Sequence, residues 1–153
     1  MKILSMPKGA DHKDVFKDGA LEMGMAAYAY KANGIGSTGS AGGSLSIVGT
    51  NLRLMKSGYA GDTSWITDEI DFTNVNSITL TVANFSSFTM YAGVTQSGLV
   101  DNYTMLSKVD IPTTGIYTID TSSITGLGRL AICLYVNNTN THYADFSSII
   151  VNN

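Results

Sequence analysis

Four carboxylates lie close to the only tryptophan of the chain and form the densest acidic group in the sequence. Asp62 precedes Trp65, and Asp68, Glu69 and Asp71 follow it. Two carboxylates could act as acid and base in glycoside hydrolysis, and carboxylate oxygens with loop carbonyls could hold a structural Ca²⁺ ion. Acidic side chains, however, are usually solvated or cap turns. We therefore predict neither a catalytic residue nor a metal ligand in this group.

Other candidates for catalysis lack the partners that they need. A Ser/His/Asp triad requires a base, and the two histidines, His12 and His142, are far apart with no nucleophile motif beside either one. Cys133 is the single cysteine, so it is expected to be a small buried side chain. Gly34–Gly39 matches GxGxxG, but the Gly- and Ser-rich residues after it do not favour the helix that a dinucleotide site requires. The sequence predicts a protein that is not an enzyme and binds no cofactor.

Aromatic side chains in or beside predicted loops suggest a different chemistry. A flat ring can stack on the apolar face of a sugar while Asn, Asp or Arg side chains bind its hydroxyl groups. The predicted glycan platform consists of Tyr59, Asp62, Trp65, Tyr91 and Tyr103, and Tyr143 lies in a similar position. The alternative is that these rings pack in the core or at a subunit contact, because aromatic residues are common in both settings.

One short pattern occurs twice, 49 residues apart. Ile70–Val75 and Ile119–Ile124 both begin Ile-Asp, continue with Thr, Ser or Asn, and end in an aliphatic residue. An aspartate in this position can accept hydrogen bonds from the backbone N–H groups that follow it. We therefore predict that Asp71 and Asp120 form turns at related corners of two sheets.

The elements that must position these residues are predicted to be strands. Ser77–Val82 alternates strictly between polar and aliphatic residues, which is typical of a strand with one buried face. Sixteen glycines and only two prolines also favour many short strands joined by turns. The nine predicted strands are 25–30, 44–48, 51–56, 77–82, 88–95, 106–111, 115–120, 130–136 and 146–151. This number and spacing predict an all-β fold, an antiparallel β-sandwich or jelly roll over residues 25–153, with a barrel as the alternative.

The first 24 residues are the most charged stretch and show no sustained period of 2 or 3.6. We predict an extended N-terminal arm over residues 1–24 that lies outside the sandwich and docks on a partner through Phe16, Leu21 and Met23. Disorder of the terminus is the alternative interpretation.

The charge balance excludes some partners. A net charge of −3, with the basic residues scattered, argues against a phosphate-binding face for nucleic acid. The longest apolar run, Leu130–Val136, has the length of a strand and is much shorter than the ~20 residues of a membrane span. Polar residues interrupt the N-terminus before the apolar core of a signal peptide could form.

Two stretches, Thr67–Val82 and Tyr117–Tyr135, resemble a β-sandwich module that recurs in virion proteins of tailed bacteriophages. In that module an Ile-Asp-x-Thr-Asn turn precedes an alternating strand, and the second stretch leads into the last hairpin. The resemblance covers roughly residues 28–151. It implies a structural or adhesive role without fixed catalytic residues. Because a short arm and one sandwich make up the whole chain, it favours a particle-decorating protein over the tip of a fibre.

The expected function is therefore that of a capsid-decorating or head-fibre protein whose arm binds other virion proteins and whose sandwich faces outward. The alternative is a carbohydrate-binding adhesin or tail receptor-binding module that recognises glycans on a host or mucosal surface. The protein is expected on the surface of the virion, made in the host cytoplasm without a signal peptide. Multivalency favours a homo-oligomer, for which we predict a trimer.

Overall fold

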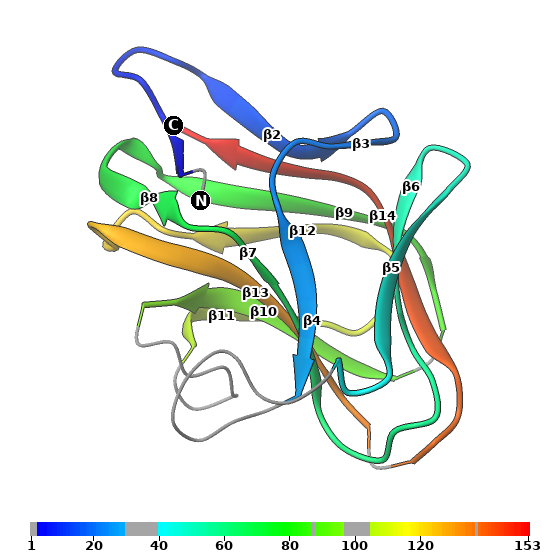
Figure 1. Cartoon of the computed structure of the whole chain (residues 1–153). Coiled ribbons are helices and arrows are strands. Elements are labelled where there is room, and N and C mark those ends of the chain that lie inside the picture. The colour runs from blue at the N-terminus through cyan, green and yellow to red at the C-terminus, as the bar shows by residue number, and fades with distance from the viewer. Residues whose placement is uncertain (1–2, 30–39, 87, 97–104, 137) are drawn as a thin grey trace.

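The computed structural model describes residues 3–29, 40–86, 88–96, 105–136 and 138–153. Within these ranges the chain forms fourteen strands in two sheets of seven, which face each other across a shared core (Figure 1). The prediction of an all-β sandwich is confirmed. The GxGxxG match at Gly34–Gly39 and Tyr103 of the predicted glycan platform lie outside the described residues.

The first sheet, called sheet I, has the strand order β1-β8-β13-β10-β11, and β7 pairs with both β13 and β4. Its pairings are antiparallel except for that of β1 with β8, which is parallel. The strands are β1 (Leu4–Ser5), β4 (Met25–Ala29), β7 (Thr63–Thr67), β8 (Ile70–Asp71), β10 (Thr89–Thr95), β11 (Leu106–Ile111) and β13 (Leu127–Tyr135). A 3₁₀ turn, η1 (Phe72–Asn74), follows β8.

The second sheet, called sheet II, has the order β12-β9-β14-β2-β3, and β6 pairs with both β14 and β5. All of its pairings are antiparallel. The strands are β2 (His12–Lys17), β3 (Ala20–Leu21), β5 (Gly43–Val48), β6 (Asn51–Lys56), β9 (Ser77–Phe85), β12 (Gly115–Asp120) and β14 (His142–Asn152). The long strand β14 therefore binds β6, β9 and β2 and organises the sheet.

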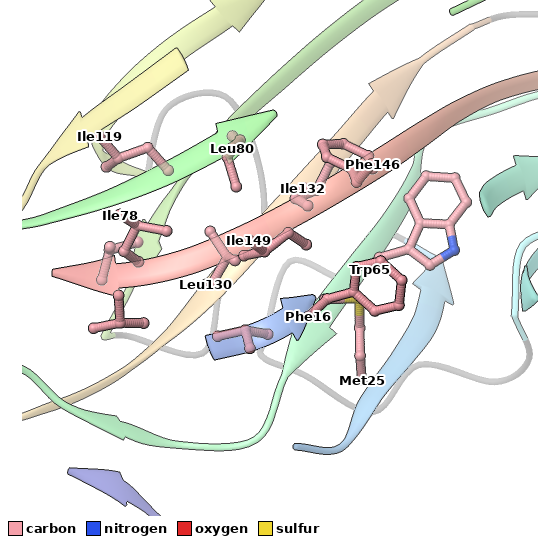
Figure 2. Packing of buried hydrophobic residues seen from close by; sticks show 14 of the residues in the cluster. Phe16, Met25, Trp65, Ile78, Leu80, Ile119, Leu130, Ile132, Phe146 and Ile149 are labelled. Atoms are coloured by element: carbon pink, nitrogen blue, oxygen red, sulfur yellow. The ribbon is translucent and has the colours of Figure 1, made fainter. Parts of the chain in front are cut away.

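All nine predicted strands are present, and β6, β11 and β12 have the predicted bounds. The alternation predicted for Ser77–Val82 is confirmed by burial: in β9, Ile78, Leu80 and Val82 are in the core, while the residues between them are partly exposed. The sheets meet through such aliphatic side chains, shown in Figure 2. Among the described residues, no helix has the length and apolar character needed to cross a membrane.

The predicted turns at Asp71 and Asp120 are confirmed. The Asp71 Oδ1 accepts hydrogen bonds from the Thr73 backbone N–H and hydroxyl, at 3.0 and 2.6 Å. Asp120 Oδ1 accepts the equivalent pair from Ser122, at 3.0 and 2.6 Å. Asp71 ends β8 of sheet I and Asp120 ends β12 of sheet II, so the two turns lie at corners of different sheets.

The prediction that residues 1–24 form an arm outside the sandwich is wrong for the part that the structure describes. Strand β2 pairs with β14 over Ser148–Asn152 (Figure 1). The Val15 and Phe16 side chains are fully buried, and Figure 2 shows Phe16 among the core residues. Between Ile149 and Ile150 the register shifts by one residue, so β2 carries a β-bulge at this point. The bulge lets two consecutive residues face the core, and it also removes the period of 2 that would have revealed the strand.

The docking residues predicted within this segment are therefore part of the fold. Phe16 and Met23 belong to the core cluster, and Leu21 packs against it. Phe16 and Met23 are buried and cannot dock on a partner while the chain stays folded, and Leu21 is partly buried.

Candidate functional site

The predicted glycan platform does not exist as one surface. Trp65 was expected beside a loop, but it lies in β7 with no exposed area and belongs to the core (Figure 2). Its indole N–H donates to the Ser44 carbonyl, 3.0 Å away in sheet II. The side chain cannot stack on a sugar, so its assignment as a binding residue is wrong. Tyr91 is also unsuitable, because it is only 5% exposed in β10.

Strand β7 was missed because its composition is polar while its environment is buried. All five residues from Thr63 to Thr67 are buried. Their hydroxyls are satisfied inside the protein: Thr63 donates to the Ala41 carbonyl at 2.7 Å, and Ser64 Oγ lies 3.0 Å from the Sγ of Cys133. Such hydrogen bonds make burial of these hydroxyl groups possible, and they leave no trace in local sequence patterning.

Tyr59 and Asp62 remain near the surface, in the loop between β6 and β7. The Tyr59 side chain is 38% exposed, and the ammonium nitrogen of Lys56 lies 5.7 Å from the centre of its ring. The Lys56 ammonium is buried and donates to the carbonyls of Gly61 and Val136. Burial lowers the pKa of Lys56, and the charge of Asp62 opposes that shift. The hydrogen bonds of Lys56 hold the loop between β6 and β7 in place, and Tyr59 is the exposed aromatic ring of this loop.

The other acidic residues near Trp65 each make a separate contact. Glu69 forms an ion pair with Arg129, at 3.5 Å between Oε1 and Nη2, while Asp71 closes its turn. The Asp68 carboxylate lies against Gly24, where an added Cβ would overlap with it. Among the described residues, no group of three or more His, Cys, Asp or Glu side chains is arranged to hold a metal ion.

The histidines lie apart. His12 is exposed in β2, and His142 begins β14 with its Nε2 3.0 Å from the Asn138 Oδ1. The His142 ring contacts the Phe88 ring edge-on at 5.6 Å between centroids. Burial lowers the pKa of His142, and the nearby Lys56 ammonium adds to this effect.

A polar network on the outward face of sheet II brings together four side chains that the sequence did not group. Arg53 donates from Nε and Nη2 to the two carboxylate oxygens of Asp145, at 2.7 and 2.9 Å. Asn84 donates from Nδ2 to Asp145 Oδ2 at 3.1 Å. The guanidinium carbon of Arg53 lies 4.2 Å from the centre of the Tyr143 ring. We call Arg53, Asn84, Tyr143 and Asp145 the sheet II network.

The pairing of β14 with β6 and β9 determines where this network lies. In β6, Leu52 and Leu54 point into the core, so Arg53 between them points outward. Asp145 is paired with Arg53 of β6 and with Asn84 of β9, so it stands between a cation and an amide. Tyr143 lies two residues before Asp145 and therefore on the same face.

The network provides a rigid arrangement of donors beside an aromatic ring. The Asp145 side chain is 1% exposed and that of Arg53 is 28% exposed. The buried aspartate therefore holds the arginine in place, and part of the arginine side chain reaches solvent. The hydrogen bond with Asp145 raises the pKa of Arg53, which therefore stays charged. Arg53 uses two of its five N–H donors on Asp145, and others can bind ligand oxygens. Asn84 is exposed and also presents an amide oxygen as acceptor.

The sequence indicated the outward orientation of one residue of this network. Alternation in the predicted strand 51–56 already places Arg53 opposite the leucines, on the outward face. Tyr143 and Asp145 were hidden because the predicted last strand began at Phe146, whereas β14 begins at His142. The contacts themselves join residues 92 and 61 positions apart, which no local pattern indicates.

No family model and no curated protein matches this chain. Solved structures do. A low-affinity xylan-binding module from the gut symbiont Roseburia intestinalis aligns with a TM-score of 0.50 and 12% identity, over 83% of this chain and 93% of that one. A family 6 carbohydrate-binding module aligns with a TM-score of 0.50 and 11% identity, over 92% of this chain and 98% of that one.

An agarase aligns with a TM-score of 0.54 and 7% identity, over 94% of this chain but only 25% of the agarase. At these identities the likeness concerns the fold alone. The chain has the two-sheet sandwich fold that is also found in carbohydrate-binding modules.

Proposed function

We propose that this chain is a non-catalytic module that binds neutral glycans through the sheet II network. The observation that carries the proposal is the partly exposed Arg53 guanidinium, held by the buried Asp145 against the Tyr143 ring. A sugar needs both an apolar surface for its C–H face and fixed groups for its hydroxyls, and this network offers both. The likeness in fold to modules that bind carbohydrate supports the same function.

The charges of the network favour a neutral ligand. The single positive charge of Arg53 is matched by the negative charge of Asp145. The pair therefore supplies directed hydrogen-bond donors without a net charge that would attract an ionic ligand over a distance.

The proposal is tested with the multimerised full-length chain on a glycan array, followed by affinity electrophoresis in gels that contain soluble xylan or each polysaccharide found on the array. Tyr143→Ala removes the ring, and Arg53→Lys keeps the charge but loses the two-pronged geometry. We expect each change to weaken binding at least tenfold, about 1.4 kcal/mol. Tyr59→Ala is the matched control, because Tyr59 is an exposed ring outside the network, and it should bind as the wild type does.

Two results would contradict this proposal. Absence of any glycan signal with the wild-type multimer would argue against glycan binding altogether. Loss of binding in Tyr59→Ala with full binding in Tyr143→Ala would move the site to the loop between β6 and β7. Trp65→Ala is unsuitable as a probe, because removal of a fully buried tryptophan is expected to cost about 3–5 kcal/mol of stability.

Attachment to a bacteriophage particle is a second proposal, supported by the resemblance of Thr67–Val82 and Tyr117–Tyr135 to virion modules. Both stretches lie within the sandwich, so the proposal does not depend on a free N-terminal arm. Co-sedimentation of the purified chain with phage particles that lack it tests this function, and unchanged recovery in the supernatant would contradict it.

A further inference from the structure

Strand β5 forms a free edge of sheet II. It pairs with β6 and with no other strand in the part of the chain that the structure describes, and the β5–β6 hairpin lies at the margin of the sandwich (Figure 1). Ile47 and Val48, the last two residues of the strand, are 48% and 40% exposed. An edge strand of this kind offers unpaired backbone groups to another strand.

The orientation of these backbone groups follows from the pairing of β5 with β6. In an antiparallel pair, residues whose N–H and C=O groups point to the neighbouring strand alternate with residues whose groups point away. The Ser57 N–H donates to the Gly42 carbonyl at 3.0 Å, just before β5 begins, so Gly42 bonds toward the β6 side. Gly43 and every second residue after it, Leu45 and Ile47, therefore point away from β6. Leu45 and Ile47 together offer two donors and two acceptors on the free edge.

The composition of β5 does not protect this edge. Edge strands are usually protected by charged residues, by bulges or by being short. The edge strand β11 of sheet I carries Lys108 and Asp110 and a shift of register, and the edge strand β3 has only two residues. Strand β5 has six residues without a charge or a proline, and its register is unbroken. This combination indicates an edge that another strand covers.

The free edge is complementary to a second copy of itself. When two β5 strands pair antiparallel with Leu45 opposite the partner's Ile47, each of the two such pairs makes two backbone hydrogen bonds. The exposed Ile47 then covers an apolar side chain, which stabilises a cross-strand pair. Ser46 lies opposite the partner's Ser46, where both side chains are small. Because β5 is uncharged, the contact brings no like charges together, although the chain has a net charge of −3.

We propose that two copies of this chain associate edge to edge through β5, so that sheet II continues from one copy into the other. The two-fold axis passes through Ser46, so each copy contributes the same groups and the free donors and acceptors of Leu45 and Ile47 are all paired. The contact uses one strand of each copy and is small, so the dimer is weak and depends on protein concentration. The association itself does not depend on glycan binding.

The association has a consequence for the sheet II network, and this consequence rests on the proposed function. Arg53 pairs with Ser46 and lies on the same face. Three strand spacings, about 14 Å, therefore separate Arg53 from the partner's Arg53 in the dimer. Both networks lie on one outward face, so the dimer can bind a single polysaccharide chain at two points.

Sedimentation velocity of the full-length chain over a range of protein concentrations tests the association. We expect the wild type to shift from the mass of one chain to twice that mass as the concentration rises. Ile47→Lys places a charge on the edge and should weaken the association about tenfold or more. Ile116→Lys is the matched control, because Ile116 is a 72% exposed isoleucine on the edge strand β12, and it should associate as the wild type does. Far-UV circular dichroism verifies that both variants are folded.

Disulfide formation tests the register of the two strands. Ser46→Cys places two thiols in a pair without backbone hydrogen bonds, whose Cα atoms are about 4.5 Å apart, a distance that a disulfide can span. Ser44→Cys is the control: it is exposed on the same face, but its equivalent in the partner is four positions away, about 13 Å along the strand. We expect disulfide-linked dimers on a non-reducing gel with Ser46→Cys and none with Ser44→Cys. Cys133 is buried and should not link chains in either variant.

The proposal is overturned if the wild type keeps the mass of one chain, which would leave the edge to a strand of another protein, or if it forms a trimer. It is also overturned if Ile116→Lys weakens the association as much as Ile47→Lys does, if Ser46→Cys does not link two chains, or if Ser44→Cys links them as readily. These experiments measure mass and linkage without a glycan, so their failure and the failure of the proposed function can be told apart.

Discussion

Asp71 and Asp120 use one carboxylate oxygen each to accept two hydrogen bonds from the residue two positions later. These bonds lower the pKa of both carboxyl groups, first through the side-chain hydroxyl and then through the backbone N–H. The unfolded chain has an ordinary aspartate pKa near 3.9. Folding therefore favours the charged form of both residues.

The pH dependence of stability follows from this shift. Because the folded pKa is below the unfolded one, the stabilisation is fully present above about pH 4 and is lost as the pH falls through the folded pKa. The double variant Asp71→Asn/Asp120→Asn keeps an acceptor at each turn but has no charge to titrate. We expect its urea midpoint to fall less than that of the wild type between pH 6 and pH 2.5. An equal fall in both proteins would contradict the role given to these carboxylates.

The N-terminal segment shows how one element differs from its sequence-based interpretation. Its charge and lack of periodicity predicted an arm, yet β2 supplies Val15 and Phe16 to the core and pairs with β14. Lys13 and Lys17 on the same strand are exposed, so charge and burial coexist within six residues. The bulge and the mixed composition concealed a strand that the sandwich needs.

A chain that begins at Met25 is therefore expected not to fold. It lacks Phe16, and loss of one buried aromatic side chain alone costs about 3–5 kcal/mol, against a total stability of about 5–15 kcal/mol. Far-UV circular dichroism and urea titration of the truncated chain measure this effect. Lys17→Ser, at an exposed position of the same strand, is the control and should unfold at the wild-type midpoint. A truncated chain with wild-type stability would restore the interpretation of residues 1–24 as an arm.

At the scale of the whole molecule, Trp65 joins the two layers. It lies in β7 of sheet I, belongs to the shared core and donates to the Ser44 carbonyl in β5 of sheet II. The core cluster contains residues from both sheets and from β2. The two sheets should therefore unfold together.

This is measurable because Trp65 is the only tryptophan. We expect the urea transition followed by tryptophan fluorescence to coincide with that followed by far-UV circular dichroism, as in two-state unfolding. Trp65→Phe removes the fluorescence signal and serves as the control for its origin. A fluorescence transition at lower urea concentration than the circular dichroism transition would show that the sheets separate before they unfold.

The pattern of polar and apolar residues within short segments was sufficient to predict most of the strands. The strands of Ser77–Val82 and Asn51–Lys56 alternate because each has one face in the core, and that period is written in consecutive residues. The candidate site was much less predictable. Tyr59 was correctly placed in an exposed loop, whereas Trp65 was assigned to a surface that it does not reach.

The sequence by itself determined the all-β class, nine of the strands and the two aspartate turns, because each depends on residues a few positions apart. Only the tertiary structure decided that β2 and β7 belong to the sheets, and that Arg53, Asn84 and Asp145 meet. Those outcomes depend on pairings between strands distant in the chain, which bury polar Thr and Ser residues by satisfying their hydroxyls. Such pairing is a property of the whole sandwich, and no short segment encodes it.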